Sequence, residues 1–153
     1  MLRLATIGYE GATVGDFLDA LRRAKIELLV DVRAVAMSRR PGFAKTALAA
    51  NLREAGIDYL HLRALGTPAD GRAAARSGHH DTMRRIFLTH LATPDAQDAL
   101  ATLGDLVRSE RPVCILCFEA DPAHCHRRLV ADALRERMPL EVDDLFPGSD
   151  DTE

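Results

Sequence analysis

Short apolar runs alternate with segments of helical periodicity along almost the whole chain. The run at residues 28–32 is apolar at every position except Asp31, which is typical of a strand buried on both faces of a parallel sheet. The runs that suit strands are residues 2–7, 28–32, 57–62, 112–118 and, as a short edge strand, 140–142. Because strands that alternate with helices define α/β proteins, we predict a three-layer fold with a mostly parallel sheet of four to five strands and helices on both faces.

Helices are predicted between these strands from the spacing of apolar residues and from capping residues. Thr13 with Asp16 three residues later resembles a capping box, Gly56 suits the position after a helix end, and Pro94 suits the first position of a helix. The predicted helices cover residues 13–25, 45–55, 82–91 and 93–107, and a last helix carries Leu129 and Leu134 and ends before Pro139.

The length of 153 residues fits one domain, and we predict a single α/β domain over residues 1–153. Residues 64–80 lack periodicity and are rich in glycine. We expect them to form a loop-rich surface excursion with some helix around residues 72–76, and a loop of this length is often functional. Residues 143–153 are expected to form an acidic C-terminal tail.

No apolar run approaches the roughly 20 residues that span a bilayer, so we expect a cytoplasmic protein without a membrane partner. The cysteines are Cys114, Cys117 and Cys125, and an odd number without a signal peptide argues against a disulfide framework. Their thiols are expected to be reduced. Neither a cofactor nor an oligomeric state follows from the composition.

The charge is uneven, because residues 33–85 hold 10 basic and 4 acidic residues although the whole chain has a net charge of -3. Most of the basic residues are arginines, whose planar guanidinium suits phosphate or carboxylate groups. This region is therefore either a solvated surface or a patch that faces an anionic ligand.

Polar residues follow each predicted strand, and in an open parallel sheet ligands bind beyond the carboxyl ends of the strands. We expect these residues to share one rim of the sheet. They are Tyr9 and Glu10 after the first strand, Asp31 and Arg33 after the second, His61 and Arg63 after the third, and Cys117, Glu119 and residues 121–127 after the fourth.

Cys125, His126 and Arg127 form the sharpest cluster, because Asp121 and Pro122 are expected to cap and begin the last helix just before them. A helix start and cationic neighbours stabilise a thiolate, which would make Cys125 a nucleophile. The same helix start could instead hold a phosphate with Arg127 as a bidentate partner. The third reading is a buried structural cysteine beside a surface histidine and arginine.

Two carboxylates belong to the predicted site. Glu119 lies two residues after Cys117 and shares its face, so it is a candidate general base or a residue that orients His126. Asp31 is a candidate partner for Arg33 in an ion pair that directs the arginine into the crevice. Tyr9 and Glu10 are candidate ligand contacts in the tight turn after the first strand.

Spacing limits the other chemistry open to the cysteines. A cysteine-based phosphatase loop needs an arginine at the position that Ala123 occupies after Cys117 and Ala131 occupies after Cys125. Cys114 and Cys117 lie on opposite faces of a strand, which excludes a redox pair. The ligand types at Cys117, His124, Cys125 and His126 would allow a metal site, but none is predicted, because adjacent residues such as Cys125 and His126 rarely bind one ion and no second pair has zinc-finger spacing.

Seven short motifs occur in order and together resemble the family called domain of unknown function 488. They are Thr6-Ile-Gly-Tyr-Glu-Gly11, Val30-Asp-Val-Arg33, Ser38-Arg39 with Pro41-Gly-Phe43, Gly56-Ile-Asp-Tyr59, Leu65-Gly-Thr-Pro68, Leu116-Cys-Phe-Glu119 and Cys125-His-Arg127. The resemblance implies a three-layer α/β fold and a bacterial or archaeal cytosolic protein. It supports Asp31, Arg33, Glu119, Cys125, His126 and Arg127 as motif positions, and it supplies no reaction.

These observations lead to three hypotheses. The first is a thiol-dependent hydrolase or transferase for a small anionic or nucleotide-like substrate, with Cys125 as nucleophile, Glu119 or His126 as base, and Arg33 and Arg127 holding the anion. The second is a module that binds or processes nucleic acid through residues 33–85. The third is a non-catalytic anion-binding domain.

Overall fold

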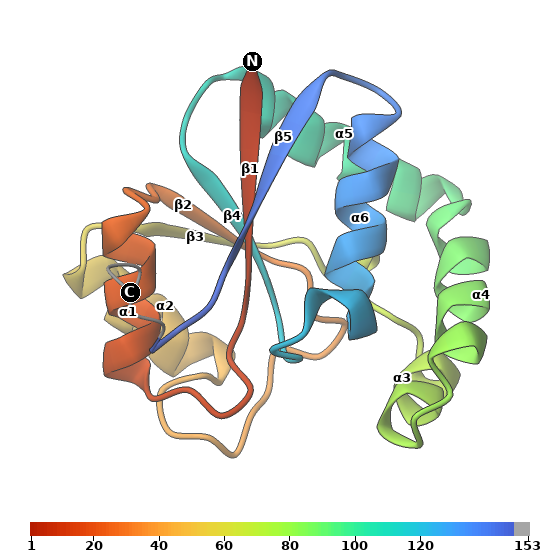
Figure 1. Ribbon diagram of the computed structural model, residues 1–153, viewed down its shortest axis with the longest axis horizontal. Coiled ribbons are helices and arrows are strands. Elements are labelled where there is room, and N and C mark those ends of the chain that lie inside the picture. The colour runs from red at the N-terminus through yellow and green to blue at the C-terminus, as the bar shows by residue number, and fades with distance from the viewer. Residues whose placement is uncertain (149–153) are drawn as a thin grey trace.

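The computed structural model describes residues 1–148 and contains one parallel sheet with helices on both faces (Figure 1). Its strands are β1 (Leu2–Gly8), β2 (Leu28–Asp31), β3 (Asp58–His61), β4 (Val113–Cys117) and β5 (Leu140–Leu145). Every strand pair is parallel, in the order β3-β2-β4-β1-β5. This architecture confirms the predicted α/β class.

The helices form an outer layer on each face of the sheet. One face packs on α1 (Val14–Arg23) and α2 (Lys45–Glu54), and the other packs on α4 (His80–Leu91), α5 (Pro94–Arg108) and α6 (His126–Arg135), with α3 (Ala69–Arg76) beside α4. Two hydrophobic cores follow from the alternation of side chains along the strands. In β4, Ile115 and Cys117 belong to the core under α4–α6, while Cys114 and Leu116 belong to the core under α1 and α2.

The strand register aligns the carboxyl ends of the three central strands. Gly8 of β1 lies opposite Cys117 of β4, and Asp31 of β2 lies opposite Leu116. From this edge β1 leads to α1 on one face of the sheet, whereas β4 leads to α6 on the other face. Neighbouring strands that diverge in this way open the crevice in which α/β proteins bind ligands.

The capping residues explain where several helices begin and end. The Thr13 hydroxyl accepts a hydrogen bond from the Asp16 backbone N–H at 3.1 Å, and Thr93 caps α5 in the same way. Gly56 follows α2 with a φ of 77°, a conformation that is strained for other residues. The Thr13 cap and the position of Gly56 confirm the sequence prediction, and Thr93 caps the helix that Pro94 was predicted to begin.

Three local predictions need correction. Residues 69–76 form the continuous helix α3, which begins earlier in the expected loop-rich segment than the short helix predicted around residues 72–76; alanines at four of its eight positions favour a helix. Asp121 caps a separate 3-10 turn, Pro122–His124, and Cys125 is itself the N-cap residue of α6. The expected acidic tail begins later, because residues 143–145 pair with β1 as the end of β5. The rest of that predicted tail, from 149 onward, lies outside the described residues.

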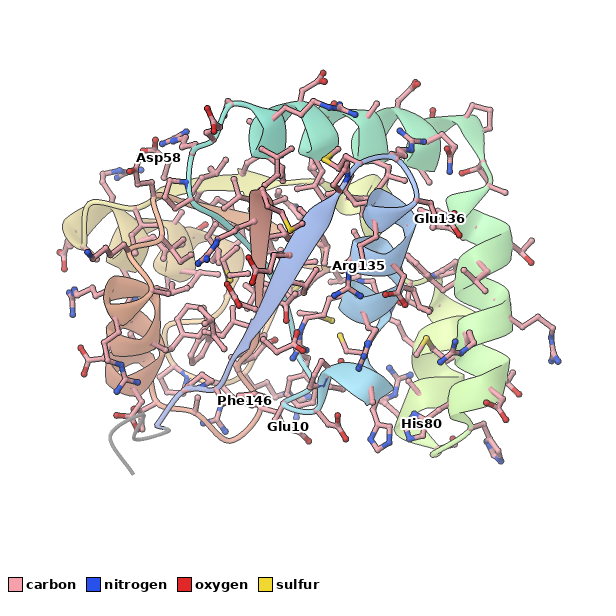
Figure 2. All side chains as sticks on the ribbon, turned by 45° about the horizontal axis from the view of Figure 1, so that its top comes forward. Glu10, Asp58, His80, Arg135, Glu136 and Phe146 are labelled. Carbon is pink, nitrogen blue, oxygen red and sulfur yellow. The ribbon has the colours of Figure 1, made fainter. Side chains whose placement is uncertain are left out.

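Labelled side chains mark the two ends of the sheet (Figure 2). Glu10 and His80 lie at the end where the strands finish, and Asp58, the first residue of β3, lies at the opposite end. None of the helices within residues 1–148 is both long enough and apolar enough to cross a membrane.

Candidate functional site

A cavity of about 300 Å³ opens at the carboxyl ends of the strands. Its lining comes from segments far apart in the sequence: Tyr9, Arg33, Ala34, Val35, Met37, Thr67, Arg72, Ala75, Arg76, Met83, Cys117, Phe118, Glu119 and His126. The volume is at the lower end of the range for small-molecule sites. A larger cavity of about 760 Å³ lies along β1, β5 and α1, and its lining contains no cysteine or histidine among the described residues.

Two cysteines and a histidine meet at the wall of the smaller cavity. His126 Nδ1 lies 3.3 Å from Cys117 Sγ and 3.8 Å from Cys125 Sγ. The other ring nitrogen, Nε2, donates a hydrogen bond of 2.8 Å to the carbonyl oxygen of Val32. Because a carbonyl oxygen only accepts, the proton of the neutral ring lies on Nε2, and the Nδ1 lone pair points at the sulfurs.

The backbone explains how neighbouring residues reach the same point. Cys117 ends β4 with its side chain on the α6 face of the sheet. Cys125 has an extended backbone, with φ -123° and ψ 144°, as the N-cap residue of α6, and His126 is the first helical residue. The change of direction at this cap turns both side chains toward Cys117. Cys125 and His126 thus approach the same sulfur atom although they are adjacent in the sequence.

Glu119 extends this cluster into the cavity. The Cys117 thiol donates a hydrogen bond of 3.5 Å to Glu119 Oε2. Burial and the charge of the nearby Cys125 sulfur raise the pKa of Glu119 to about 7. A carboxyl group with this pKa exchanges protons near neutral pH, as a general acid or base must.

The two thiols share one environment but titrate differently. Burial and the adjacent Cys125 sulfur raise the pKa of Cys117 well above its ordinary value. Burial also disfavours the charged form of Cys125, but its interactions with Cys117 and His126 and the positive charge of Arg127 outweigh burial and lower its pKa. The pKa of His126 is raised, because its interactions with Cys125 outweigh its burial. The pair of sulfurs therefore favours a single negative charge beside the imidazole ring.

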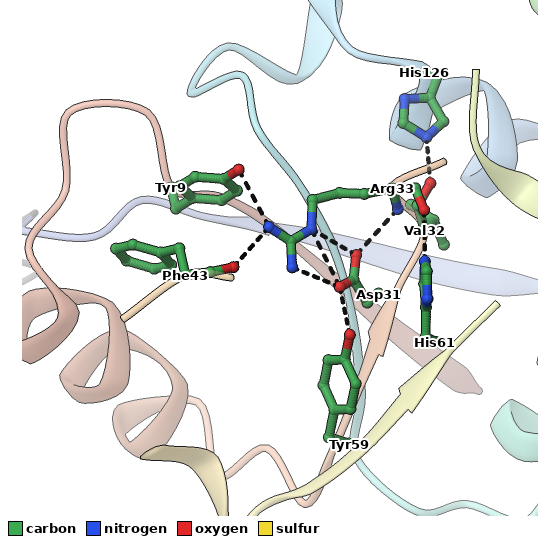
Figure 3. A network of polar contacts seen from close by, with 8 residues as sticks. All are labelled: Tyr9, Asp31, Val32, Arg33, Phe43, Tyr59, His61 and His126. Atoms are coloured by element: carbon green, nitrogen blue, oxygen red, sulfur yellow. Dashed lines mark hydrogen bonds and ion pairs between the residues drawn. The ribbon is translucent and has the colours of Figure 1, made fainter. Parts of the chain in front are cut away.

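Arg33 is held on the floor of the cavity by the ion pair expected from the sequence (Figure 3). Its Nη2 lies 2.7 Å from Asp31 Oδ2, and its Nε donates to Asp31 Oδ1 at 2.9 Å. Its Nη1 donates to the Phe43 carbonyl oxygen at 2.8 Å and to the Tyr9 hydroxyl at 3.2 Å. Burial lowers the pKa of Arg33, but Asp31 more than offsets this and raises it overall. Arg33 thus shapes the wall, and most of its donors already have partners.

Arg127 has a structural position that differs from the expected phosphate contact. Its side chain is fully buried, and it lies outside the cavity lining as far as residues 1–148 show. Its guanidinium donates to the carbonyl oxygens of Glu119 and Ala120 and to the Thr6 hydroxyl at 3.2 Å. Arg127 therefore holds the loop that carries Glu119 against β1, since its donors are engaged by protein oxygens.

Glu10 supports the same loop from outside. Its exposed side chain accepts a hydrogen bond of 3.0 Å from the Ala120 backbone N–H, and its own N–H donates to the Phe118 carbonyl oxygen at 2.8 Å. Tyr9 lies in the cavity wall, stacked on Phe43 with 4.6 Å between ring centroids. Of the two predicted ligand contacts in this turn, the structure brings Tyr9 to the cavity and leaves Glu10 at its rim.

The remaining histidines lie away from the sulfur atoms. His124 is half-exposed and stacks on His80 with 4.1 Å between ring centroids. His61 Nε2 donates to the Arg33 carbonyl oxygen at 2.6 Å, and His90 Nε2 donates to the Ala64 carbonyl oxygen at 2.7 Å. Of the histidines, His126 alone joins the cluster within the part of the chain that the structure describes.

Two basic cavity residues were not singled out in the sequence, and a third residue, Cys117, was expected at the strand-end rim but not in a catalytic role. Arg72 and Arg76 of α3 line the cavity, and Arg76 is exposed to solvent. Their spacing of four residues places them on one face of a helix, but α3 itself was only partly predicted. Cys117, rather than Cys125, lines the cavity. In the sequence, the signal for Cys117 was its position two residues before Glu119.

Cys117 Sγ, Cys125 Sγ and His126 Nδ1 also have the donor types of a metal site. All three atoms lie within 4.8 Å of one another, and all three residues are buried. Thiolate sulfur and imidazole nitrogen are the donors that Zn²⁺ prefers in proteins. These are the residues that could hold a metal ion at the cavity wall.

The fold and this cluster define the class of protein: a parallel α/β protein with a cysteine–histidine–carboxylate cluster at the carboxyl ends of its central strands. The family model described as domain of unknown function DUF488 matches residues 13–134, most of the chain. The chain belongs to this family, which confirms the resemblance seen in its motifs. No curated protein and no solved structure matches it.

Proposed function

We propose that this chain is an enzyme, a hydrolase or group transferase, that acts on a small anionic or nucleotide-like molecule held in the cavity of about 300 Å³. One observation carries this proposal. The cavity wall combines a sulfur–imidazole–carboxylate cluster, formed by Cys117, His126 and Glu119, with two arginines from another helix. Titratable groups with perturbed pKa values beside cationic side chains in one cavity are typical of active sites.

The arginines of α3 supply anion recognition. Arg76 is exposed at the cavity, and Arg72 is oriented by a hydrogen bond of 2.9 Å from its Nη1 to the Thr67 carbonyl oxygen. Two guanidinium groups one helical turn apart suit the oxygens of a phosphate or carboxylate group. Tyr9, Phe118 and Met83 offer an apolar and aromatic wall for the rest of the substrate. This arrangement of arginines and apolar wall suits an anionic molecule that also has a planar or apolar part.

The reacting centre is the sulfur–imidazole cluster. Cys117 is the sulfur that faces the cavity, so it replaces Cys125 as the residue that meets a substrate, and Cys125 acts through its contact with His126. Glu119 is the general base, because its carboxyl group lines the cavity with a pKa of about 7. Asp31, Arg33 and Arg127 position these groups without contacting the substrate's anionic part.

Anion binding is tested first, with inorganic phosphate, pyrophosphate and AMP as probes in calorimetric titrations. We expect binding that weakens with salt and falls at least tenfold in the variant Arg72→Ala/Arg76→Ala. Arg85→Ala is the matched control, since Arg85 is an exposed arginine on neighbouring α4 and is outside the cavity lining. Equal loss in the control, or no binding of any probe, would overturn the proposal.

Turnover separates an enzyme from a binding domain. Bound probes and their activated esters are incubated with the protein and followed by phosphorus NMR. We expect conversion that disappears in Cys117→Ala while AMP affinity is kept. Recovery of every bound molecule unchanged would favour the non-catalytic alternative, and a shift of labelled DNA or RNA at low salt that survives Arg72→Ala/Arg76→Ala would favour the nucleic-acid alternative.

A further inference from the structure

We propose that Cys117, Cys125 and His126 bind one Zn²⁺ ion through two sulfur atoms and Nδ1, with the fourth coordination position open to the cavity. The metal site rests on the geometry of these three residues alone. Only the assignment of the open position to catalysis rests on the proposed function.

The spacing of the donor atoms suits a tetrahedral ion. With Zn–S near 2.3 Å and Zn–N near 2.0–2.1 Å, a tetrahedral angle places sulfur and nitrogen about 3.6 Å apart. The observed distances from His126 Nδ1 are 3.3 Å to Cys117 Sγ and 3.8 Å to Cys125 Sγ. All three donors lie within 4.8 Å of one another. An ion therefore fits between them after small side-chain adjustments.

The orientation of His126 is a second, independent observation. Its Nε2–H donates to the Val32 carbonyl oxygen, and its ring packs 5.1 Å from the ring of Phe87. Histidines that bind metals almost always donate the other ring N–H to a carbonyl or carboxylate, which holds the ring and leaves the coordinating nitrogen with its lone pair. The structure holds His126 in this state, with Nδ1 facing both sulfurs.

Charge and donor type favour zinc. Two thiolates balance the charge of a divalent ion, so the occupied site is neutral, and a neutral complex costs little to bury. Thiolate and imidazole donors select Zn²⁺ over Mg²⁺ and Ca²⁺, which prefer oxygen. Cys125 is 2% exposed and His126 is 6% exposed, so the site excludes most water except at the cavity.

The open coordination position would determine what chemistry the metal site can perform. Cys117 and His126 line the cavity, whereas Cys125 closes the other side, so the ion would face Glu119 and the arginines of α3. Structural zinc sites use four protein ligands, and catalytic sites keep one position for water or substrate. Three protein ligands, two of which line a cavity, match the catalytic pattern. An anionic oxygen of the substrate or a water molecule would take the fourth position.

The test uses the full chain, freed of metal with a chelator under reducing conditions. Addition of Co²⁺ is followed by absorption, and Zn²⁺ affinity is measured by competition with a chromophoric chelator. We expect one ion per chain, sulfur-to-cobalt charge-transfer bands and the visible spectrum of a tetrahedral site. Cys117→Ser, Cys125→Ser and His126→Gln should each weaken Zn²⁺ binding by more than the roughly 10- to 100-fold that is typical of losing a supporting hydrogen bond.

Two control variants keep the result interpretable. Cys114→Ala removes a buried thiol from the opposite face of β4, and His124→Gln removes the exposed imidazole next to the site. Both should retain the cobalt spectrum and the Zn²⁺ affinity, and circular dichroism establishes that each variant folds. If a variant of the three ligands unfolds, carboxymethylation is the second measurement, because Zn²⁺ should protect Cys117 and Cys125 but not change the labelling of Cys114.

The outcomes distinguish this proposal from the proposed function. A chain that binds neither ion, or binds them equally well in Cys117→Ser and Cys125→Ser, overturns the zinc site. If AMP affinity still depends on Arg72 and Arg76 in that case, the anion-binding enzyme stands and its chemistry belongs to the thiols. If Zn²⁺ binds as expected but AMP does not, the metal site stands and the substrate class is wrong.

Discussion

Asp31 and Arg33 form a buried ion pair, and backbone carbonyl oxygens of the same short segment accept hydrogen bonds from two histidines. Nη2 of Arg33 lies 2.7 Å from Oδ2 of Asp31, and their side chains are 5% and 0% exposed. The carbonyl oxygen of Val32, the residue between the two, accepts a hydrogen bond from Nε2–H of His126. The carbonyl oxygen of Arg33 accepts one from Nε2–H of His61. The pair therefore fixes the strand end that orients the histidine of the site (Figure 3).

Replacing Asp31 by asparagine should destabilise the protein strongly. The variant leaves the buried guanidinium of Arg33 without its countercharge, and breaking a buried pair in this way costs about 3–5 kcal/mol. Tyr59→Phe is the control, because it removes only the Tyr59 hydroxyl that donates to Asp31 Oδ2 at 2.6 Å, a loss of about 1 kcal/mol. Urea unfolding measures both free energies. Similar values for the two variants would contradict the central role of the ion pair.

Arg127→Lys tests whether Arg127 is a positioning residue or an anion contact. A lysine cannot reach the two carbonyl oxygens of residues 119 and 120 and the Thr6 hydroxyl together, so we expect a loss of about 1.5–3 kcal/mol in the free energy of unfolding. AMP affinity should change little, since the lysine stays outside the cavity. Arg128→Lys, at an exposed neighbouring position, should change neither quantity. A large loss of AMP affinity with intact stability would restore the phosphate contact expected from the sequence.

Gly8→Ala should disturb the Glu119 loop from the side of β1. A Cβ at residue 8 would lie 1.8 Å from the Glu119 carbonyl oxygen, so the loop must move, at a cost of about 1–3 kcal/mol or more. Gly15→Ala is the matched control in α1, where the nearest atom is 4.0 Å away and alanine favours the helix by about 0.5–1 kcal/mol. The midpoint temperature of thermal unfolding should therefore fall for Gly8→Ala and rise for Gly15→Ala. If Gly8→Ala leaves the temperature of thermal unfolding unchanged, the loop is free to shift.

The metal-free protein should lose stability as the pH rises through the range in which Glu119 titrates. The pKa of Glu119 is about 7 in the folded chain against 4.5 as its ordinary value, because of burial and the neighbouring Cys125. The folded state therefore binds more protons than the unfolded state between these pH values, and the contribution of Glu119 falls as the pH rises. Cys117 and His126 also face this carboxyl group and shift the profile.

Glu119→Gln isolates this contribution, because it removes the titrating group and keeps the size of the side chain. Urea unfolding of the chelator-treated protein across the same pH range should give a flatter profile for the variant than for the parent chain. Parallel profiles would mean that Glu119 is not the group responsible. Glu10→Gln is the control, since Glu10 is an exposed carboxylate that accepts a hydrogen bond from the same loop.

Local sequence patterns were enough to predict most of the elements of the fold. The strands, the cap at Thr13, the helix start at Pro94 and the helix end at Gly56 depend on neighbours within a few residues, and the spacing of side chains shows such interactions directly. The Asp31–Arg33 pair and the shared face of Cys117 and Glu119 have the same origin, because residues two apart lie on one side of a strand.

Contacts between distant segments were decided only by the tertiary structure. The burial of Arg127 depends on Thr6, more than a hundred residues earlier, and the cavity depends on α3, which folds against α4. The sequence therefore determined which chemical groups stand at the strand ends, through local periodicity. Packing of the helices decided that Cys117 faces the cavity, that Arg127 does not, and that His126 turns its Nδ1 toward two sulfurs, because each outcome depends on partners that no short segment contains.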